Sequence, residues 1–158
     1  IIVMQTQKQI QGLINRLNNI YSGTPWYGTD IQSSLAKVNA ESGLKPKIPG
    51  KRSIAEIIRH MVAWRSYLLE HLKGNSDFDI EIDSETDWPS TEGMSWQEVL
   101  AELEASQRNI LACLQPKTDD WLKETIGKRQ FNFRFLIEGI IQHDIYHLGQ
   151  INMLNNLP

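Results

Sequence analysis

The 158-residue chain has a single cysteine, Cys113, and no long run of apolar residues. One cysteine excludes an internal disulfide framework, so the fold does not depend on an oxidising compartment. The longest apolar runs fall far short of the ~20 residues that a membrane-spanning helix needs. The first residues also lack the cationic start and apolar block of a signal peptide. We therefore expect a soluble, cytoplasmic protein.

The chain also has no strong excess of positive or negative charge. Its 16 Lys and Arg residues nearly balance its 19 Asp and Glu residues, and the net charge is −3. The basic residues form no stripe, and the acidic ones gather between Asp77 and Glu92. A nucleic-acid-binding protein normally presents a basic face, so we expect no nucleic acid and no membrane as partner. The length and the 41% hydrophobic content fit one globular domain over residues 1–158.

What the sequence does contain is helical periodicity. Apolar residues recur at i, i+3 and i+4 in four main segments, which are residues 4–21, 53–73, 95–114 and 132–155. No alternation of strands with helices is present. The pattern predicts an all-α four-helix bundle, and the long connections between its helices require at least one crossover.

Capping signals mark where several helices begin. Ser53 and Ser95 are each followed by Glu three residues later, the arrangement of a capping box. A shorter helix is expected over residues 30–39 with Thr29 as its N-cap, whereas glycines and prolines predict a loop over residues 40–52.

The last predicted helix contains the most informative pair of residues, His143 and His147. At about 100° per residue, two positions four apart lie on the same side of a helix, one turn from each other. Both histidines fall in the middle of an apolar stripe, where an uncompensated imidazole costs about 1–3 kcal/mol. A shared metal ion accounts for both, and Gly139, one turn earlier, leaves space beside them. The alternative is that each ring bonds a neighbouring carbonyl group.

A tetrahedral metal ion needs at least a third protein ligand. Of the two other histidines, His60 lies beside the apolar arc of the second main helix, whereas His71 lies near the end of that helix and is expected to be solvated. We therefore select His60 and hold His71 in reserve. Three imidazoles with an open position are typical of a catalytic metal site, and zinc or nickel suits such ligands.

Two other metal motifs do not fit. A zincin protease needs His-Glu-x-x-His, but Asp144 stands in the Glu position, and a ferritin-like di-iron site needs Glu-x-x-His at a spacing that the chain lacks. Around the histidines, we select five residues for the second shell or the pocket, with plain packing as the alternative for the aromatic ones: Asp144, Tyr146, Gln150, Trp64 and Trp26.

At this point the sequence resembles a known family. The string His143-Asp-Ile-Tyr-His147-Leu-Gly-Gln-Ile is similar to the last-helix signature of the DinB-like (DNA-damage-inducible) four-helix-bundle superfamily. Three further groups of motifs agree in order along the chain; they comprise Pro25-Trp26-Tyr27-Gly28, then Pro49-Gly50 with His60-Met-Val-Ala-Trp64, then Asp87-Trp88-Pro89 with Trp96-Gln-Glu.

The resemblance implies an up-down-down-up bundle that is often a homodimer. It also implies a zinc or nickel ion on His60, His143 and His147. Some relatives are thiol-dependent transferases or isomerases, and the family name refers to expression under stress. We keep two interpretations: a metal-dependent, thiol-dependent transferase or hydrolase acting on small molecules, and a non-catalytic, metal-stabilised stress-response or interaction domain. Whether the chain is an enzyme stays open on the sequence, and no catalytic residue is assigned.

Overall fold

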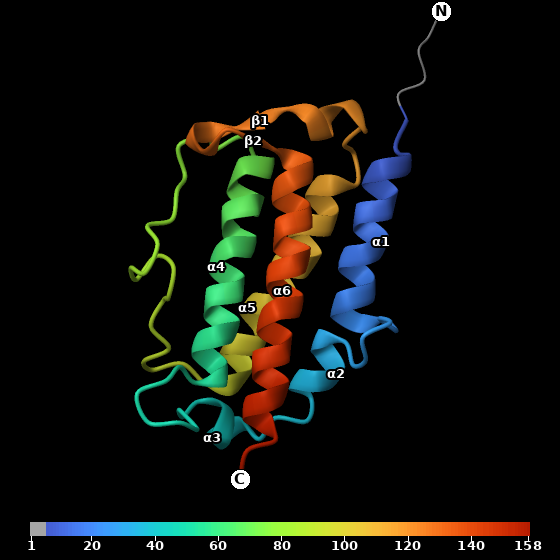
Figure 1. The fold of residues 1–158 in the computed structure, drawn as a ribbon. Helices are drawn as coiled ribbons and strands as arrows, with labels where there is room; N and C mark the ends of the chain where they lie inside the picture. The colour runs from blue at the N-terminus through green and yellow to red at the C-terminus, as the bar shows by residue number, and fades with distance from the viewer. Residues whose placement is uncertain (1–5) are drawn as a thin grey trace, which may run out of the picture.

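Four long helices form the body of the protein in the computed structural model, which describes residues 6–158 (Figure 1). Their bounds are α1 (Lys8–Ser22), α4 (Ile54–Leu72), α5 (Trp96–Leu114) and α6 (Phe133–Asn155). The mostly helical fold predicted from the apolar periodicity is therefore confirmed. The expected first helix included residues 4 and 5, which lie outside the described residues.

Shorter elements close the two ends of the bundle (Figure 1). One end carries α2 (Ile31–Leu35) and α3 (Ala40–Gly43), and α3 lies within a segment that was predicted to be loop. The other end carries the 3-10 turn η1 (Asp120–Lys123) and then a two-stranded antiparallel hairpin of β1 (Thr125–Ile126) and β2 (Phe131–Asn132), whose strands are joined by the 3-10 turn η2 (Gly127–Arg129).

Side-chain caps determine where the helices start. The capping boxes expected at Ser53 and Ser95 are both present, with each hydroxyl accepting from the backbone N–H three residues on. The expected cap at Thr29 is wrong, because Asp30 accepts from the backbone N–H of Ser33 and starts α2 one residue later. Asn39 caps α3 in the same way, which explains why a helical turn forms there.

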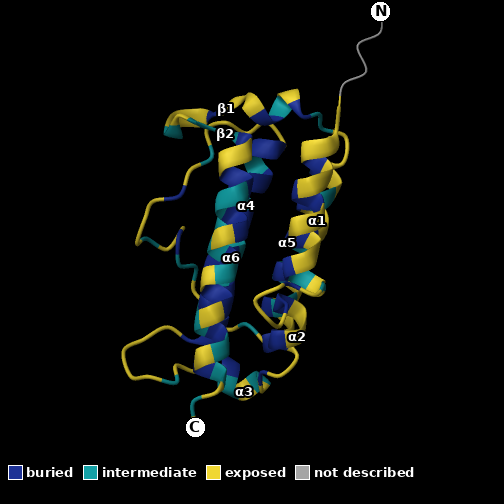
Figure 2. Ribbon diagram, turned by 45° about the vertical axis from the view of Figure 1, so that its right-hand side comes forward, coloured by how far each residue is buried: buried dark blue, intermediate teal, exposed yellow. Residues whose placement is uncertain are grey.

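The buried faces of α1, α4, α5 and α6 meet in the interior (Figure 2). One polar cluster crosses this core: Arg65 of α4 is fully buried and forms two hydrogen bonds, 3.0 and 2.7 Å long, to Asp144 Oδ2 of α6. The same guanidinium donates to Gln107 of α5 at 2.8 Å. These bonds fix the register of three helices around the interior.

The connection between α4 and α5 positions the candidate site. Figure 1 shows residues 73–95 returning along the outside of the bundle, so that α4 and α5 run in one direction and α1 and α6 in the other. Asp87 lies on this segment and is buried, although most of its neighbours are exposed. None of the helices within residues 6–158 combines the length and apolar character that crossing a bilayer requires.

Candidate metal centre

Three histidines from two helices converge on one point in the structure. His60 comes from α4, and His143 and His147 come from consecutive turns of α6. The Nε2 atom of His143 lies 3.0 Å from that of His60 and 3.1 Å from that of His147. His60 and His147 are buried and His143 is half-buried. The sequence had selected the same three residues, and the structure brings them together.

Asp87 contacts the His60 ring at Nδ1, the nitrogen that does not face the other two histidines. The Nδ1 atom of His60 lies 2.8 Å from the backbone oxygen of Asp87 and 2.9 Å from its Oδ1 atom. The same Oδ1 accepts a hydrogen bond from the Trp64 indole at 2.8 Å, and Oδ2 accepts from the backbone N–H of Asp83. The backbone oxygen and Oδ1 of Asp87 are both hydrogen-bond acceptors, so His60 Nδ1 carries the proton. The Nε2 atom of His60 therefore directs its lone pair toward His143 and His147.

Trp88 covers one face of the His60 ring. Its ring stacks on that of His60, with 3.8 Å between centroids and 7° between planes. The Arg52 guanidinium lies 4.8 Å from the Trp88 ring centroid. In the sequence, Asp87 and Trp88 stand out only as part of the motif shared with the DinB-like family, which indicates no role for either residue. The feature of the sequence that could have identified these two residues is the short Asp-Trp-Pro motif within an otherwise polar loop.

Gln150 fixes the ring of His147 in the same manner. The Nδ1 atom of His147 lies 2.7 Å from Gln150 Oε1, so it donates and Nε2 again offers a lone pair. His143 differs, because its Nδ1 atom is buried and has no hydrogen-bond partner within residues 6–158. Gln150 was expected near the site and lies there.

This donor set suits a cation. Two of the three Nε2 atoms have lone pairs directed inward, and a neutral His143 carries at most one Nε2 proton, which satisfies only one of them. The three candidate ligand atoms lie within 4.8 Å of one another. Zinc–nitrogen bonds of about 2.0–2.1 Å at tetrahedral angles place two nitrogens about 3.3 Å apart, close to the 3.0 and 3.1 Å that separate His143 Nε2 from the other two Nε2 atoms. The residues therefore fit a divalent metal ion.

Burial keeps the imidazoles of His143 and His147 neutral. It lowers the pKa of His143 to about 3, and the neighbouring His147 and His60 rings act in the same direction. Burial also lowers the pKa of His147, although the hydrogen bond with Gln150 opposes this effect. Only an unprotonated imidazole binds a metal, so both rings are available as ligands at neutral pH.

The other residues selected from the sequence are distributed differently. Trp64 lies near the site, 6.3 Å from His143 between ring centroids, and acts on it through Asp87. The Tyr146 ring contacts that of His147 at 5.0 Å but is largely exposed. The carboxylate of Asp144 instead pairs with Arg65 inside the bundle. Trp26, expected near the site, is fully exposed in the turn after α1.

His71, the reserve ligand, takes no part in the cluster. Its Nδ1 atom lies 2.9 Å from the backbone oxygen of Tyr67, one turn earlier in α4. The expectation that it is solvated is wrong, because the ring is only 5% exposed. The residues around Gly127 cover it, since a Cβ atom added to that glycine would lie 3.2 Å from His71 Nε2.

An apolar cavity of about 230 Å³ borders His143 directly. Gly139, one turn before His143, forms part of its wall, and a Cβ atom added there would meet nothing within 4 Å. The space that the sequence predicted beside this glycine is therefore present. The remaining wall is mainly aromatic and aliphatic, from Trp64, Phe131, Phe135, Leu136 and Ile140.

Fold and site together define a helical bundle with a three-histidine centre between two of its helices. The family model described as the DinB superfamily matches residues 28–151, and the chain belongs to this superfamily. The chain is similar in fold to the colibactin self-resistance protein ClbS in complex with a dsDNA, with a TM-score of 0.67, 14% identity and 96% of each chain covered. A conserved protein from Enterococcus faecalis gives a TM-score of 0.65, 13% identity and 98% coverage of each chain. No curated protein matches the chain.

One expectation about partners is corrected by these comparisons. The absence of a basic stripe was used to exclude nucleic acid, but ClbS, with the same fold, is found with double-stranded DNA. Net charge is a poor guide here because phosphate contacts come from individual cationic and polar side chains and from backbone N–H groups. The exclusion of nucleic acid is therefore wrong, and the expected homodimer is not shown.

Proposed function

We propose that the protein binds one divalent metal ion, zinc or nickel, through the Nε2 atoms of His60, His143 and His147. We further propose that it is a metal-dependent enzyme acting on small molecules. The observation that carries this proposal is the convergence of three Nε2 atoms, two of them with their lone pairs fixed inward by Asp87 and Gln150.

The chemistry follows from the ligand set. A metal ion held by His60, His143 and His147 would keep a position for a further ligand, where it would polarise a bound group or lower the pKa of a bound water or thiol. Asp87 favours the charged complex by holding the proton of His60 Nδ1. Trp88 shields one face of His60 from water. These residues orient the ligands and exclude solvent, as a reacting centre requires.

Two reaction classes fit such a centre. Attack of water gives a hydrolase, and attack of a thiolate on an electrophile gives a thiol-dependent transferase. The apolar cavity beside His143 supports a small-molecule substrate, because pockets for such ligands are concave and mainly apolar. A metal ion with only a structural role needs neither an open position nor an adjoining cavity.

The test is an activity screen of the zinc- and nickel-loaded protein. We expect turnover either of an activated ester or of an electrophile supplied with a low-molecular-weight thiol. The rate should fall at least 100-fold in His143→Ala and stay unchanged in His71→Gln, which alters the chain's histidine outside the cluster. If the folded, metal-loaded protein is inactive in every assay, the enzyme proposal fails and a metal-stabilised interaction domain is left.

A further inference from the structure

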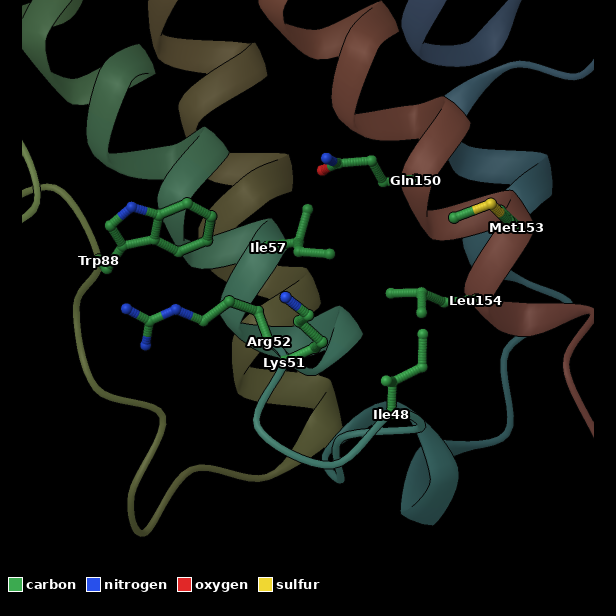
Figure 3. A pocket seen from close by; sticks show the side chains of 8 residues that line it. All are labelled: Ile48, Lys51, Arg52, Ile57, Trp88, Gln150, Met153 and Leu154. Carbon is green, nitrogen blue, oxygen red and sulfur yellow. The ribbon is translucent and has the colours of Figure 1, made fainter.

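A second cavity, of about 320 Å³, lies between the start of α4 and the end of α6 (Figure 3). Trp88 and Gln150 line it, and these two residues also contact the metal centre. Trp88 stacks on His60, and Gln150 bonds with His147. A molecule in this cavity would therefore be separated from His60 only by the Trp88 side chain and from His147 only by the Gln150 side chain.

Most of the remaining wall is apolar. Ile57 of α4 faces Met153 and Leu154 of α6, and Ile48 contributes from the loop before α4 (Figure 3). Ile48 and Met153 are 38% and 61% exposed, so the rim leaves large apolar side chains in water. An apolar ligand that covers them gains about 25 cal/mol per Å² removed from water. The shape and lining suit a short hydrocarbon or aromatic group.

The charged residues that line the cavity are both cationic, Lys51 and Arg52. The Arg52 guanidinium is already engaged, by Glu56 at 2.9 Å and by the face of Trp88. Lys51 is exposed, and within residues 6–158 it forms no ion pair. One positive charge at the mouth of this apolar cavity is therefore uncompensated.

We propose that this cavity binds a small organic anion with an apolar tail. The tail lies between α4 and α6, and the carboxylate or phosphate lies at Lys51. This inference rests on the proposed function, because it names a class of small molecule held next to that centre, in a cavity separate from the one that borders His143. It depends on different residues, however, and can be tested separately from the metal.

The experiment measures binding of octanoate, 1-octanol and octylammonium to the zinc-loaded and the zinc-free protein by calorimetry. Chemical shift changes of the Trp88 indole N–H locate the binding. We expect octanoate to bind at least tenfold more tightly than the neutral and cationic analogues. Affinity should rise about fourfold per CH₂ from butanoate to octanoate. Lys51→Gln should reduce octanoate affinity to that of octanol, and Lys8→Gln, at the opposite end of the bundle, should leave it unchanged (Figure 1).

The outcomes separate the two proposals. If the three octyl compounds bind equally, or none binds, the cavity inference is overturned. If octanoate binds only the zinc-loaded form and Lys51→Gln has no effect, the carboxylate ligates the metal; the metal site then stands and the cavity inference fails. If Lys51-dependent binding occurs in a protein that takes up no zinc, the cavity inference holds and the proposed function fails.

Discussion

At the scale of single residues, the site depends on how the outer nitrogen of each imidazole is held. Asp87 is only 3% exposed and accepts from His60, Trp64 and the backbone of Asp83. Such carboxylate–histidine–metal arrangements fix the ring and raise its basicity, and loss of the partner typically reduces metal affinity 10- to 100-fold. Asp87 is therefore a positioning residue.

Asp87→Asn tests this role. We expect the dissociation constant for zinc to rise about 10- to 100-fold, because the amide no longer provides a charged acceptor to His60 Nδ1. Competition with a chromophoric chelator measures the change, and circular dichroism verifies that the variant is folded. Asp120→Asn, at an exposed carboxylate, is the matched control and should bind zinc like the wild type. An unaltered zinc affinity in Asp87→Asn would show that the contact is only structural.

The buried histidines also predict how stability responds to pH. The pKa of His143 is about 3 in the folded protein and near 6.5 in the unfolded chain, so the unfolded chain takes up the proton first as the pH falls. The free energy of unfolding of the zinc-free protein should therefore decrease between pH 7 and pH 5. Urea unfolding at several pH values measures the slope, which should be smaller in His143→Gln. A slope that is the same in the variant would contradict the buried, neutral state of His143.

At the scale of elements, α4 and α6 supply all three candidate ligands and are joined by a buried ion pair. The bonds between Arg65 and Asp144 lie in the same two helices as the histidines, and Asp144 directly follows His143 in sequence. This pair fixes the register of α6 against α4. The orientation of Asp144 also explains why its expected place beside the metal is not found.

Removing one partner of this pair should be costly. Arg65→Met leaves the Asp144 carboxylate buried without a counter-ion, and we expect a loss of about 3–5 kcal/mol in the free energy of unfolding. Arg65→Met combined with Asp144→Leu should lose less than the single variant, because no buried charge is left. Urea unfolding with zinc removed measures both. Equal or greater destabilisation in the double variant would refute this account of the pair.

The elements also show what the sequence could predict. The periodicity and the capping boxes at Ser53 and Ser95 placed the long helices to within a few residues, because these signals are local. The turn of α3 and the cap at Asp30 were missed, since short elements depend on one or two side chains. The histidine pair on α6 followed from helix geometry. The role of Asp87 could not be predicted, because it comes from a loop that is distant from α6 in sequence.

At the scale of the whole molecule, family membership and fold do not settle the reaction. Fold similarity to ClbS at 14% identity concerns the scaffold, whereas function depends on the particular site. The three converging histidines and the two cavities described above are features of this chain's own side chains. They are the basis for the proposal of a metal-dependent, small-molecule function.

Metal binding should stabilise the whole bundle. Zinc at 100 times its dissociation constant adds about 2.7 kcal/mol if only the folded state binds it. For a domain of this size that corresponds to a rise in Tm of roughly 5–10 °C. Differential scanning calorimetry with zinc and with a chelator measures the difference, and His143→Ala should show almost none. An equal rise in the variant would mean that zinc binds elsewhere.

The most direct measurement of the central claim is zinc stoichiometry combined with X-ray absorption at the zinc edge. We predict one zinc ion per chain, with three imidazole nitrogens at about 2.0–2.1 Å and one further nitrogen or oxygen ligand. His60→Ala, His143→Ala and His147→Ala should each abolish stoichiometric binding in a protein that still folds. A folded wild-type protein that binds no zinc or nickel, or one whose metal lacks imidazole ligands, would contradict the account.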